Sequence, residues 1–168
     1  MKTLLKQYFG HDEFRPLQEE IINNVFSGND SFVLMPTGGG KSLCYQLPAL
    51  KFNGVALVIS PLIALMKDQV DSLKECGIKA EFINSTLTSK QIEEICQQLK
   101  NNEIKILYAA PERFALQSFQ LFLKDLNISL IAVDEAHCIS EWGHDFRPDY
   151  RNLSQLKNIF PSVPLIAL

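Results

Sequence analysis

Residues Met35 to Ser42, with the sequence MPTGGGKS, combine three consecutive glycines with a lysine and a hydroxyl side chain. Glycine lets the backbone curl so that successive N–H groups converge on one anion, and the N-terminus of a following helix favours negative charge. Lys41 adds a positive point charge, and the Ser42 hydroxyl suits Mg²⁺ as a ligand. These residue types predict a site for a phosphorylated ligand. Met35 replaces the first glycine of the usual pattern, so a flexible glycine turn with an exposed lysine stays the alternative.

A second polar group, Asp134-Glu135-Ala136-His137, follows directly after the apolar run from Leu130 to Val133. If that run is a parallel strand, its carboxyl end faces the crevice in which such sheets bind ligands. Asp134 can then hold Mg²⁺, and Glu135 can orient or deprotonate an attacking water. A simple solvated turn is the alternative for two adjacent acids.

Lys41 and Asp134 are separated by 93 residues, which is room for about three strand–helix units. This spacing favours a motor ATPase over a compact nucleotide kinase. His137 follows Asp134 by three residues and could connect a nucleotide site with a neighbouring surface. A neutral histidine in the core is the other interpretation.

The elements that must position these residues follow from hydrophobic periodicity. We expect strands at residues 32–34, 55–59, 79–83, 104–109, 130–133 and 164–168. We expect helices at residues 4–9, 16–28, 43–47, 62–77, 92–99, 119–126 and 150–159. Strands that alternate with helices in this way predict an α/β fold, with a mostly parallel β-sheet covered by helices on both faces.

Composition limits the kind of protein. The chain has 168 residues, of which 46% are hydrophobic and 21% charged, so we expect a single domain with a full core. The net charge of −3 gives no overall basic field for nucleic acid, so any such binding depends on local groups. The four cysteines form no C-x-x-C pair, which favours buried reduced thiols over zinc. No run has the length of a signal peptide core or a membrane span, and we expect a cytoplasmic protein with no membrane partner.

Five segments of the sequence can be compared with known families. They are residues 9–18, 35–50, 60–69, 108–113 and 134–150. In type and order they resemble the first RecA-like domain of RecQ-type DNA helicases of superfamily 2. The most specific is DEAHCISEWGHDFRP at residues 134–148, because other helicases of that superfamily share the acids and not the aromatic residues after them. The resemblance implies a RecA-like P-loop domain that binds ATP with Mg²⁺, and methionine at position 35 is expected in this family.

The resemblance also implies roles for single residues. Gln18 is expected at the adenine edge, where an amide can both donate and accept, with Arg15 and His11 holding the ring. The residues implied for the phosphates are Thr37, Gly38, Gly39, Gly40, Lys41 and Ser42. Lys41, Asp134 and Glu135 form the implied catalytic group, and Ser42 and Asp134 are the implied metal ligands. Apart from the resemblance, Gln18 could be an exposed helix residue.

Contacts with DNA are implied by the same resemblance. The residues are His137, Trp142, His144, Phe146 and Arg147, in an aromatic-rich loop that senses single-stranded DNA. Exposed aromatic side chains can stack on unpaired bases, although a tryptophan packed on the core is the alternative. Backbone phosphate contacts are implied for residues 60–62 and 84–86, and both triplets could instead be helix caps.

The chain is expected to be residues 1–168 of a longer helicase, a single N-terminal ATP-binding domain whose parent contains a second RecA-like domain. That second domain is implied to supply an arginine finger, whose loss costs a factor of about 10³–10⁵ in rate. We therefore expect the isolated chain to hydrolyse ATP hardly at all. An RNA-remodelling helicase, a passive nucleotide- or nucleic-acid-binding module and a small-molecule kinase are the competing interpretations. Unwinding from 3′ to 5′ is implied by the family alone.

Overall fold

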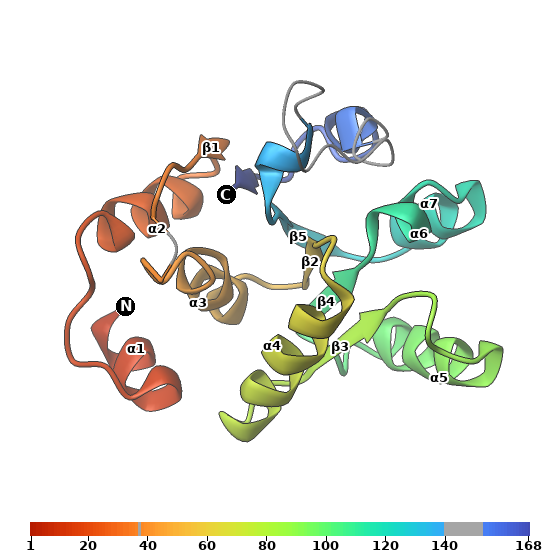
Figure 1. Ribbon diagram of the computed structural model, residues 1–168, viewed down its shortest axis with the longest axis horizontal. Helices are drawn as coiled ribbons and strands as arrows, with labels where there is room; N and C mark the ends of the chain where they lie inside the picture. The colour runs from red at the N-terminus through yellow and green to blue at the C-terminus, as the bar shows by residue number, and fades with distance from the viewer. Residues whose placement is uncertain (37, 140–152) are drawn as a thin grey trace.

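A six-stranded sheet with the order β1-β6-β5-β2-β4-β3 forms the centre of the computed structural model, which describes residues 1–36, 38–139 and 153–168 (Figure 1). The strands are β1 (Ser31–Phe32), β2 (Val55–Ile59), β3 (Ala80–Ile83), β4 (Ile106–Ala109), β5 (Ile128–Val133) and β6 (Leu165–Ala167). Neighbouring strands run parallel throughout this sheet. The predicted parallel sheet is confirmed.

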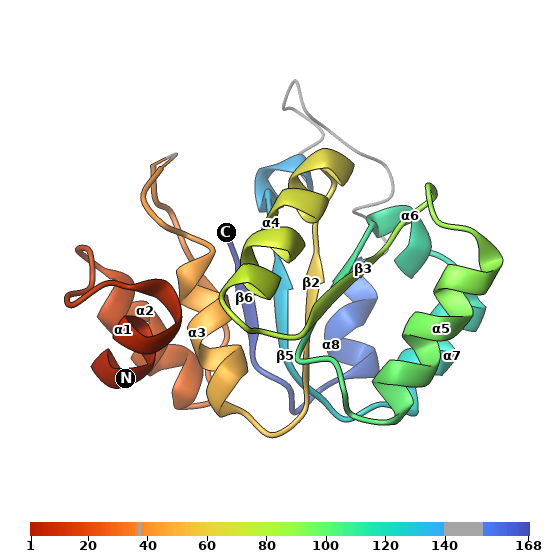
Figure 2. The ribbon, with the colours of Figure 1, turned by 90° about the horizontal axis from the view of Figure 1, so that it is seen from below.

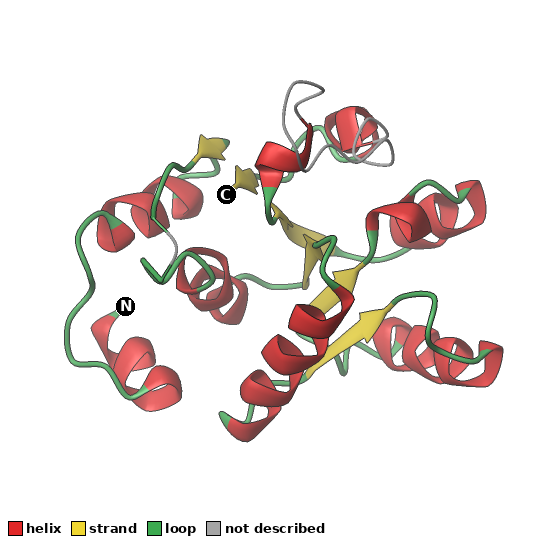
Figure 3. Ribbon diagram, viewed as in Figure 1, coloured by secondary structure: helices red, strands yellow, loops and turns green. Residues whose placement is uncertain are grey.

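Helices cover both faces of the sheet (Figure 3). On one face, Leu57 and Ile59 of β2 pack in a core with α5 (Ser89–Lys100), α7 (Gln117–Lys124) and α8 (Leu156–Ile159). On the other face, Ala56 and Val58 pack with α3 (Leu43–Lys51) and α4 (Ile63–Glu75). All five residues of β2 are buried, as expected for a strand covered on both sides.

Two N-terminal helices, α1 (Lys2–Phe9) and α2 (Gln18–Phe26), lie beside α3 at one side of the molecule (Figures 1 and 2). Leu5 and Ile22 form a small separate core with Leu43 and Leu47 of α3. Gly10 ends α1 in the left-handed conformation, with its N–H donated to the carbonyl of Lys6. This packing brings the segment between α1 and α2 close to the start of α3.

Some sequence-based predictions are wrong in detail. Helix α2 begins at Gln18 and not at residue 16, because Leu17 has a left-handed backbone with φ 70°. The one-turn helices α6 (Pro111–Phe114) and η1 (Ala136–Ile139) were not predicted, since one turn is too short to give a periodic pattern. Helix α8 begins at Leu156, later than expected, and residues 150–152 lie outside the described part of the chain.

The cysteines are free thiols, as predicted, but not all of them are buried. Cys44 and Cys138 are buried, Cys96 is half-buried and Cys76 is exposed. Cys76 follows the last turn of α4, where the chain leaves the core for the turn at Gly77. Within residues 1–36, 38–139 and 153–168, the helices are too short or too polar to cross a bilayer.

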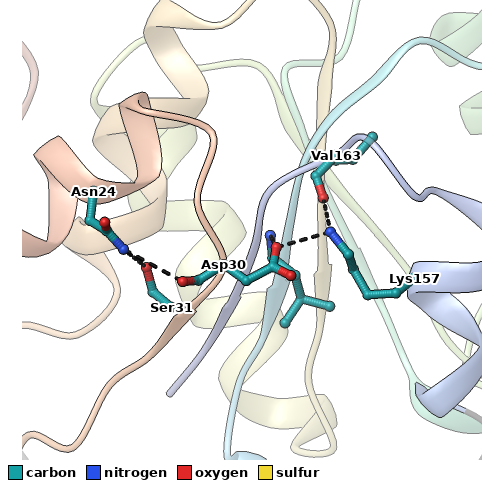
Figure 4. Close-up of polar contacts among 6 residues, drawn as sticks. Asn24, Asp30, Ser31, Lys157 and Val163 are labelled. Carbon is teal, nitrogen blue, oxygen red and sulfur yellow. Dashed lines mark hydrogen bonds and ion pairs between the residues drawn. The ribbon is translucent and has the colours of Figure 1, made fainter.

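A polar cluster fixes β1 next to β6 at the amino ends of these strands (Figure 4). Asp30 Oδ1 accepts hydrogen bonds from the backbone N–H of Leu165 at 2.9 Å and from Lys157 Nζ at 3.0 Å. Lys157 also donates to the carbonyl of Val163 at 3.0 Å. One carboxylate thus joins the strand before the phosphate loop to the last strand and to α8.

We expect Asp30→Ala to lower the free energy of unfolding by about 1–2 kcal/mol, because it leaves the Leu165 N–H and the Lys157 ammonium without this acceptor. Asp12→Ala is the matched control, since Asp12 makes an exposed ion pair with Lys6 that is worth well under about 1 kcal/mol. Urea unfolding of the two variants would measure the difference. Equal stability of both would show that the Asp30 cluster does not hold β1 in place.

Candidate functional site

The predicted site residues gather at the carboxyl edge of the sheet. The loop between β1 and α3, the end of β2 and the turn after β5 lie on the same side of the molecule (Figure 2). Asp134 follows β5 directly, and its N–H donates to the carbonyl of Ile59, the last residue of β2, at 2.8 Å. This edge is the usual ligand position in parallel α/β sheets.

The glycine-rich loop curls as the sequence predicts. Gly38 and Gly40 have φ values of 77° and 80°, a left-handed conformation that glycine adopts without strain. The N–H of Gly39 donates to the carbonyl of Pro36 at 3.0 Å and closes a tight turn. The N–H groups of Gly40, Lys41 and Ser42 donate to no acceptor among the described residues, and they precede the N-terminus of α3. Such unpaired donors at a helix start are suited to bind an anion.

Gln18, the first residue of α2, and Arg15, which precedes that helix, hold this loop, a role that the sequence did not suggest. Gln18 Nε2 donates to the carbonyl of Gly40 at 3.0 Å, and the Arg15 guanidinium donates to the carbonyl of Gly38. Gln18 Oε1 accepts from the backbone N–H of Arg15 at 2.8 Å. Gln18 is only 3% exposed, so the alternative of an exposed helix residue is wrong. A contact between Gln18 and adenine stays a prediction.

Asp134 lies among charges at the end of β5. Its carboxyl pKa is raised, mainly because the group is buried and also because Glu135 carries a charge of the same sign. The Ser60 hydroxyl donates to Asp134 Oδ2 at 3.2 Å and lowers this pKa, as does the positive charge of Lys41. Lys41 and Asp134, which are 93 residues apart in sequence, thus lie within electrostatic reach of each other.

Glu135 has a left-handed backbone with φ 52°, which is rare for a residue with a side chain. A conformation of this kind costs about 1–3 kcal/mol and tends to occur at functional sites. One carboxylate oxygen of Glu135 lies 3.2 Å from Nδ1 of His137. His137 has 58% of its side chain exposed, so the interpretation as a core histidine is wrong.

The residues at this edge fit a divalent cation. Ser42 offers a hydroxyl and Asp134 a carboxylate, which are the oxygen ligands that Mg²⁺ takes from proteins beside substrate phosphates. Asp134 and Glu135 repel each other in a partly buried position, and a cation would relieve that repulsion. The ligand roles of Ser42 and Asp134 stay predictions.

Neither of the two triplets provides a side-chain cap for the helix that follows it. Helix α4 has Leu62 at its N-cap with no side-chain hydrogen bond, and α5 is capped by Thr88, which shares a capping box with Gln91. Ser60 is instead bonded to Asp134. Asn84 Oδ1 accepts from the Thr86 N–H and hydroxyl, while its buried Nδ2 has no hydrogen-bond partner within the described part of the chain. Phosphate contacts at these triplets stay a prediction.

His11 is exposed between α1 and α2. The remaining predicted site residues, Thr37, Trp142, His144, Phe146 and Arg147, lie outside the residues that the structure describes. The described site therefore contains the glycine-rich loop, the two acids with His137, and the segment from His11 to Gln18.

Comparison with known families agrees with this geometry. Residues 15–168 match the DEAD/DEAH box helicase family. The chain belongs to this family. Its resemblance to RecQ-type helicases is confirmed by close relatives. It is 51% identical over 166 residues to the ATP-dependent DNA helicase RecQ of Haemophilus influenzae, and 49% identical to RecQ of Bacillus subtilis. It is also 45% identical to the ATP-dependent DNA helicase Q1 of Pongo abelii.

These matches cover almost all of this chain and a small part of each relative. The three alignments include 99%, 98% and 100% of the chain but only 27%, 28% and 27% of the relatives, so the chain spans about a quarter of their length. Among solved structures, the DUF1998 helicase MrfA bound to DNA and AMPPNP has a TM-score of 0.80 at 23% identity, over 99% of this chain and 25% of that one. The helicase Lhr of Mycobacterium smegmatis has a TM-score of 0.73 at 20% identity, over 98% and 24%. At these identities the structures support the fold alone, a RecA-like α/β domain.

We expect Gly40→Ala to destabilise the chain by about 2–3 kcal/mol, because alanine is strained at this φ and its Cβ would lie 2.5 Å from Gln18 Nε2. Gly28→Ala is the matched control. Gly28 has a φ of 79° but nothing within 4 Å of an added Cβ. Alanine at position 28 would therefore cause the backbone strain of about 1–2 kcal/mol without a steric clash.

A double-mutant cycle with Gln18→Ala separates the clash from the strain. The cost of Gly40→Ala, measured by urea unfolding, should be smaller in the Gln18→Ala background, where the amide is absent. An unchanged cost would mean that Gln18 does not restrict position 40.

Asp134→Asn is expected to raise the melting temperature of the metal-free chain at pH 7, because it removes a buried charge next to Glu135 and keeps an oxygen for Ser60. Addition of Mg²⁺ and ADP should then stabilise the wild type more than the variant. Asp71→Asn, on an exposed position of α4, is the control and should change neither value. A metal-free Asn variant that melts below the wild type would contradict this account.

Proposed function

We propose that the chain is the ATP-binding motor domain of a RecQ-type DNA helicase, which couples ATP hydrolysis to translocation on single-stranded DNA and to unwinding of the duplex. One observation supports this most directly. The glycine-rich loop with Lys41 and Ser42 lies at the same edge of the sheet as Asp134 and Glu135. This arrangement occurs in a chain that is 51% identical in sequence to RecQ of Haemophilus influenzae.

In this proposal the triphosphate of ATP binds to the loop from Gly38 to Ser42. The unpaired N–H groups at the start of α3 donate to phosphate oxygens, and Lys41 neutralises their charge. Ser42 and Asp134 would hold Mg²⁺, which when bound offsets negative charge on the phosphates. Arg15, Gln18 and His11 would hold the base.

Glu135 is the proposed base for hydrolysis. The left-handed backbone at Glu135, which is next to Asp134 in the chain, and the contact of its carboxylate with His137 support this role. From this position Glu135 can orient a water for in-line attack on the γ-phosphate and accept its proton. His137 contacts Glu135 and is exposed, so it could connect the nucleotide site with a neighbouring surface.

DNA is proposed to bind across the same edge of the sheet. Ser60 and Asn84 follow β2 and β3, and the hydrogen bond between Ser60 and Asp134 joins this surface to the ATP site. Trp142, His144, Phe146 and Arg147 belong to the proposed DNA-sensing loop. Movement from 3′ to 5′ rests on the resemblance alone.

Full activity is proposed to require a second RecA-like domain in the parent chain. The relatives are nearly four times as long as the part that this chain matches, which leaves room for such a domain. An arginine from that domain would stabilise the transition state, an effect of about 10³–10⁵ in rate. The chain alone should then bind nucleotide weakly and hydrolyse it hardly at all.

The test measures ATP hydrolysis by the parent helicase, with single-stranded DNA, with RNA and without either, beside the chain of 168 residues. We expect DNA-stimulated hydrolysis in the long chain alone. Glu135→Gln in the long chain should lower turnover by about 10²-fold or more while nucleotide affinity changes little. Glu103→Gln is the control, because Glu103 is exposed before β4, at the opposite edge of the sheet.

Three outcomes would contradict the proposal. Stimulation by RNA and not by DNA would indicate an RNA-remodelling helicase. Nucleotide binding without hydrolysis in the long chain would indicate a passive module. Full DNA-stimulated turnover by the 168-residue chain, or by the Glu135→Gln variant, would remove the assigned role of the second domain or of Glu135.

A further inference from the structure

Gln18, the first residue of α2, has a defined hydrogen-bond partner at each end of its side-chain amide. The residue is 3% exposed. Its Nε2 donates to the carbonyl of Gly40 at 3.0 Å, and its Oε1 accepts from the backbone N–H of Arg15 at 2.8 Å. A reversed amide would place oxygen against the Gly40 carbonyl and nitrogen against the Arg15 N–H, so that neither bond could form. The Arg15 N–H therefore decides that Gln18 presents a donor to the loop.

The turn before α2 holds this side chain in place. The Gln18 N–H donates to the carbonyl of Arg15 at 3.1 Å, and Leu17 between them has a left-handed backbone with φ 70°. Leucine rarely adopts this conformation, and residues that do so tend to occur at functional sites. Leu17 is itself 56% exposed, so its own packing gives little reason for the strained turn. The direction of the next residue, Gln18, is what the turn sets.

The carbonyl that Gln18 binds belongs to a peptide that could rotate easily. Gly40 has a φ of 80° and follows two other glycines, so the peptide planes of this loop can turn at low cost. The Gly40 carbonyl also accepts from the N–H of Leu43, at the longer distance of 3.2 Å. Without the Gln18 amide, this longer bond would be left to hold the peptide between Gly40 and Lys41.

The direction of the Gly40 carbonyl fixes the direction of the next N–H. The peptide between Gly40 and Lys41 is trans, and in a planar trans peptide the C=O and N–H bonds point in opposite directions. Because the carbonyl is turned toward Gln18, the Lys41 N–H points away from that side chain. This N–H donates to no acceptor among the described residues and precedes α3, where it is suited to bind an anion.

We propose that Gln18 is a positioning residue for phosphate binding, because it fixes the peptide between Gly40 and Lys41 with its N–H directed toward a bound polyphosphate. This inference rests on the proposed function, since it requires a polyphosphate at the loop. It differs from the predicted contact with adenine, which involves the base and not the phosphates. The two roles are compatible, because the Gln18 amide has a second N–H and a second oxygen lone pair beyond its bonds to Gly40 and Arg15.

A ligand without a base separates the two roles. The test measures the affinity of the parent helicase for ADP by calorimetry and, by displacement of ADP, for inorganic pyrophosphate, both with Mg²⁺. Gln18→Met removes the amide, keeps a side chain of similar length and leaves the charge unchanged. We expect the affinity for pyrophosphate to fall by about fivefold and that for ADP by at least as much, because the Lys41 N–H is no longer held toward the phosphates.

A second variant and a control separate the amide from the packing around it. Gln18→Ala also lacks the amide but leaves a space, so an equal loss of pyrophosphate affinity in both variants would follow from the absent donor. If Gln18→Met does not fold, Gln18→Ala gives the answer alone. Asn23→Ala, which removes an exposed amide from the same helix, should bind both ligands as the wild type does. A merely structural role would lower the melting temperature of the Gln18 variants and leave the pyrophosphate affinity of the folded protein unchanged.

The possible failures are distinguishable. A loss of ADP affinity with unchanged pyrophosphate affinity would show that Gln18 acts on the base alone, which would overturn the positioning role and leave the proposed function intact. Unchanged affinity for both ligands would do the same. Wild-type helicase that binds neither ADP nor pyrophosphate would overturn both proposals.

Discussion

The parallel pairing of β1, β6 and β5 is the constraint on which the site depends. β6 is the last strand in sequence, and it lies between the strand that leads into the glycine-rich loop and the strand that leads into Asp134. The Val33 N–H donates to the carbonyl of Ala167 at 2.8 Å, and the Leu168 N–H donates to that of Val133 at 2.9 Å. These bonds fix where each strand ends, and therefore how close Lys41 and Asp134 can lie.

Much of this arrangement follows from local sequence. Each central strand is a run of buried apolar residues, and Asp134 follows β5 directly, so its place at the carboxyl edge could be predicted without knowing the strand order. The left-handed turns at Gly38 and Gly40 were likewise predictable, because glycine is the residue that adopts them freely. The strands and the glycine turns could be predicted because each follows from residues that are adjacent in sequence.

Other features could not be predicted, because they depend on side chains that are distant in sequence. Nothing near Ser60 indicates that its hydroxyl donates to Asp134 rather than to the start of α4, and nothing near Gln18 indicates that it holds Gly40. The one-turn helix η1 begins at Ala136, whose N–H donates to the carbonyl of Leu168, directly after β6, at 2.7 Å. Contacts of this kind depend on how neighbouring strands are aligned in the sheet, because that alignment determines which distant side chains meet.

The N–H groups of Gly40, Lys41 and Ser42 have no acceptor within residues 1–36, 38–139 and 153–168, the part of the chain that the structure describes. An anion that accepts hydrogen bonds from them would stabilise the folded state by mass action, by about 2.7 kcal/mol at a concentration one hundred times its dissociation constant. Ligand binding would therefore make the folded fraction of the chain depend on the ligand concentration. The lifetime of the chain against unfolding and proteolysis would rise and fall with the supply of phosphorylated ligand around it.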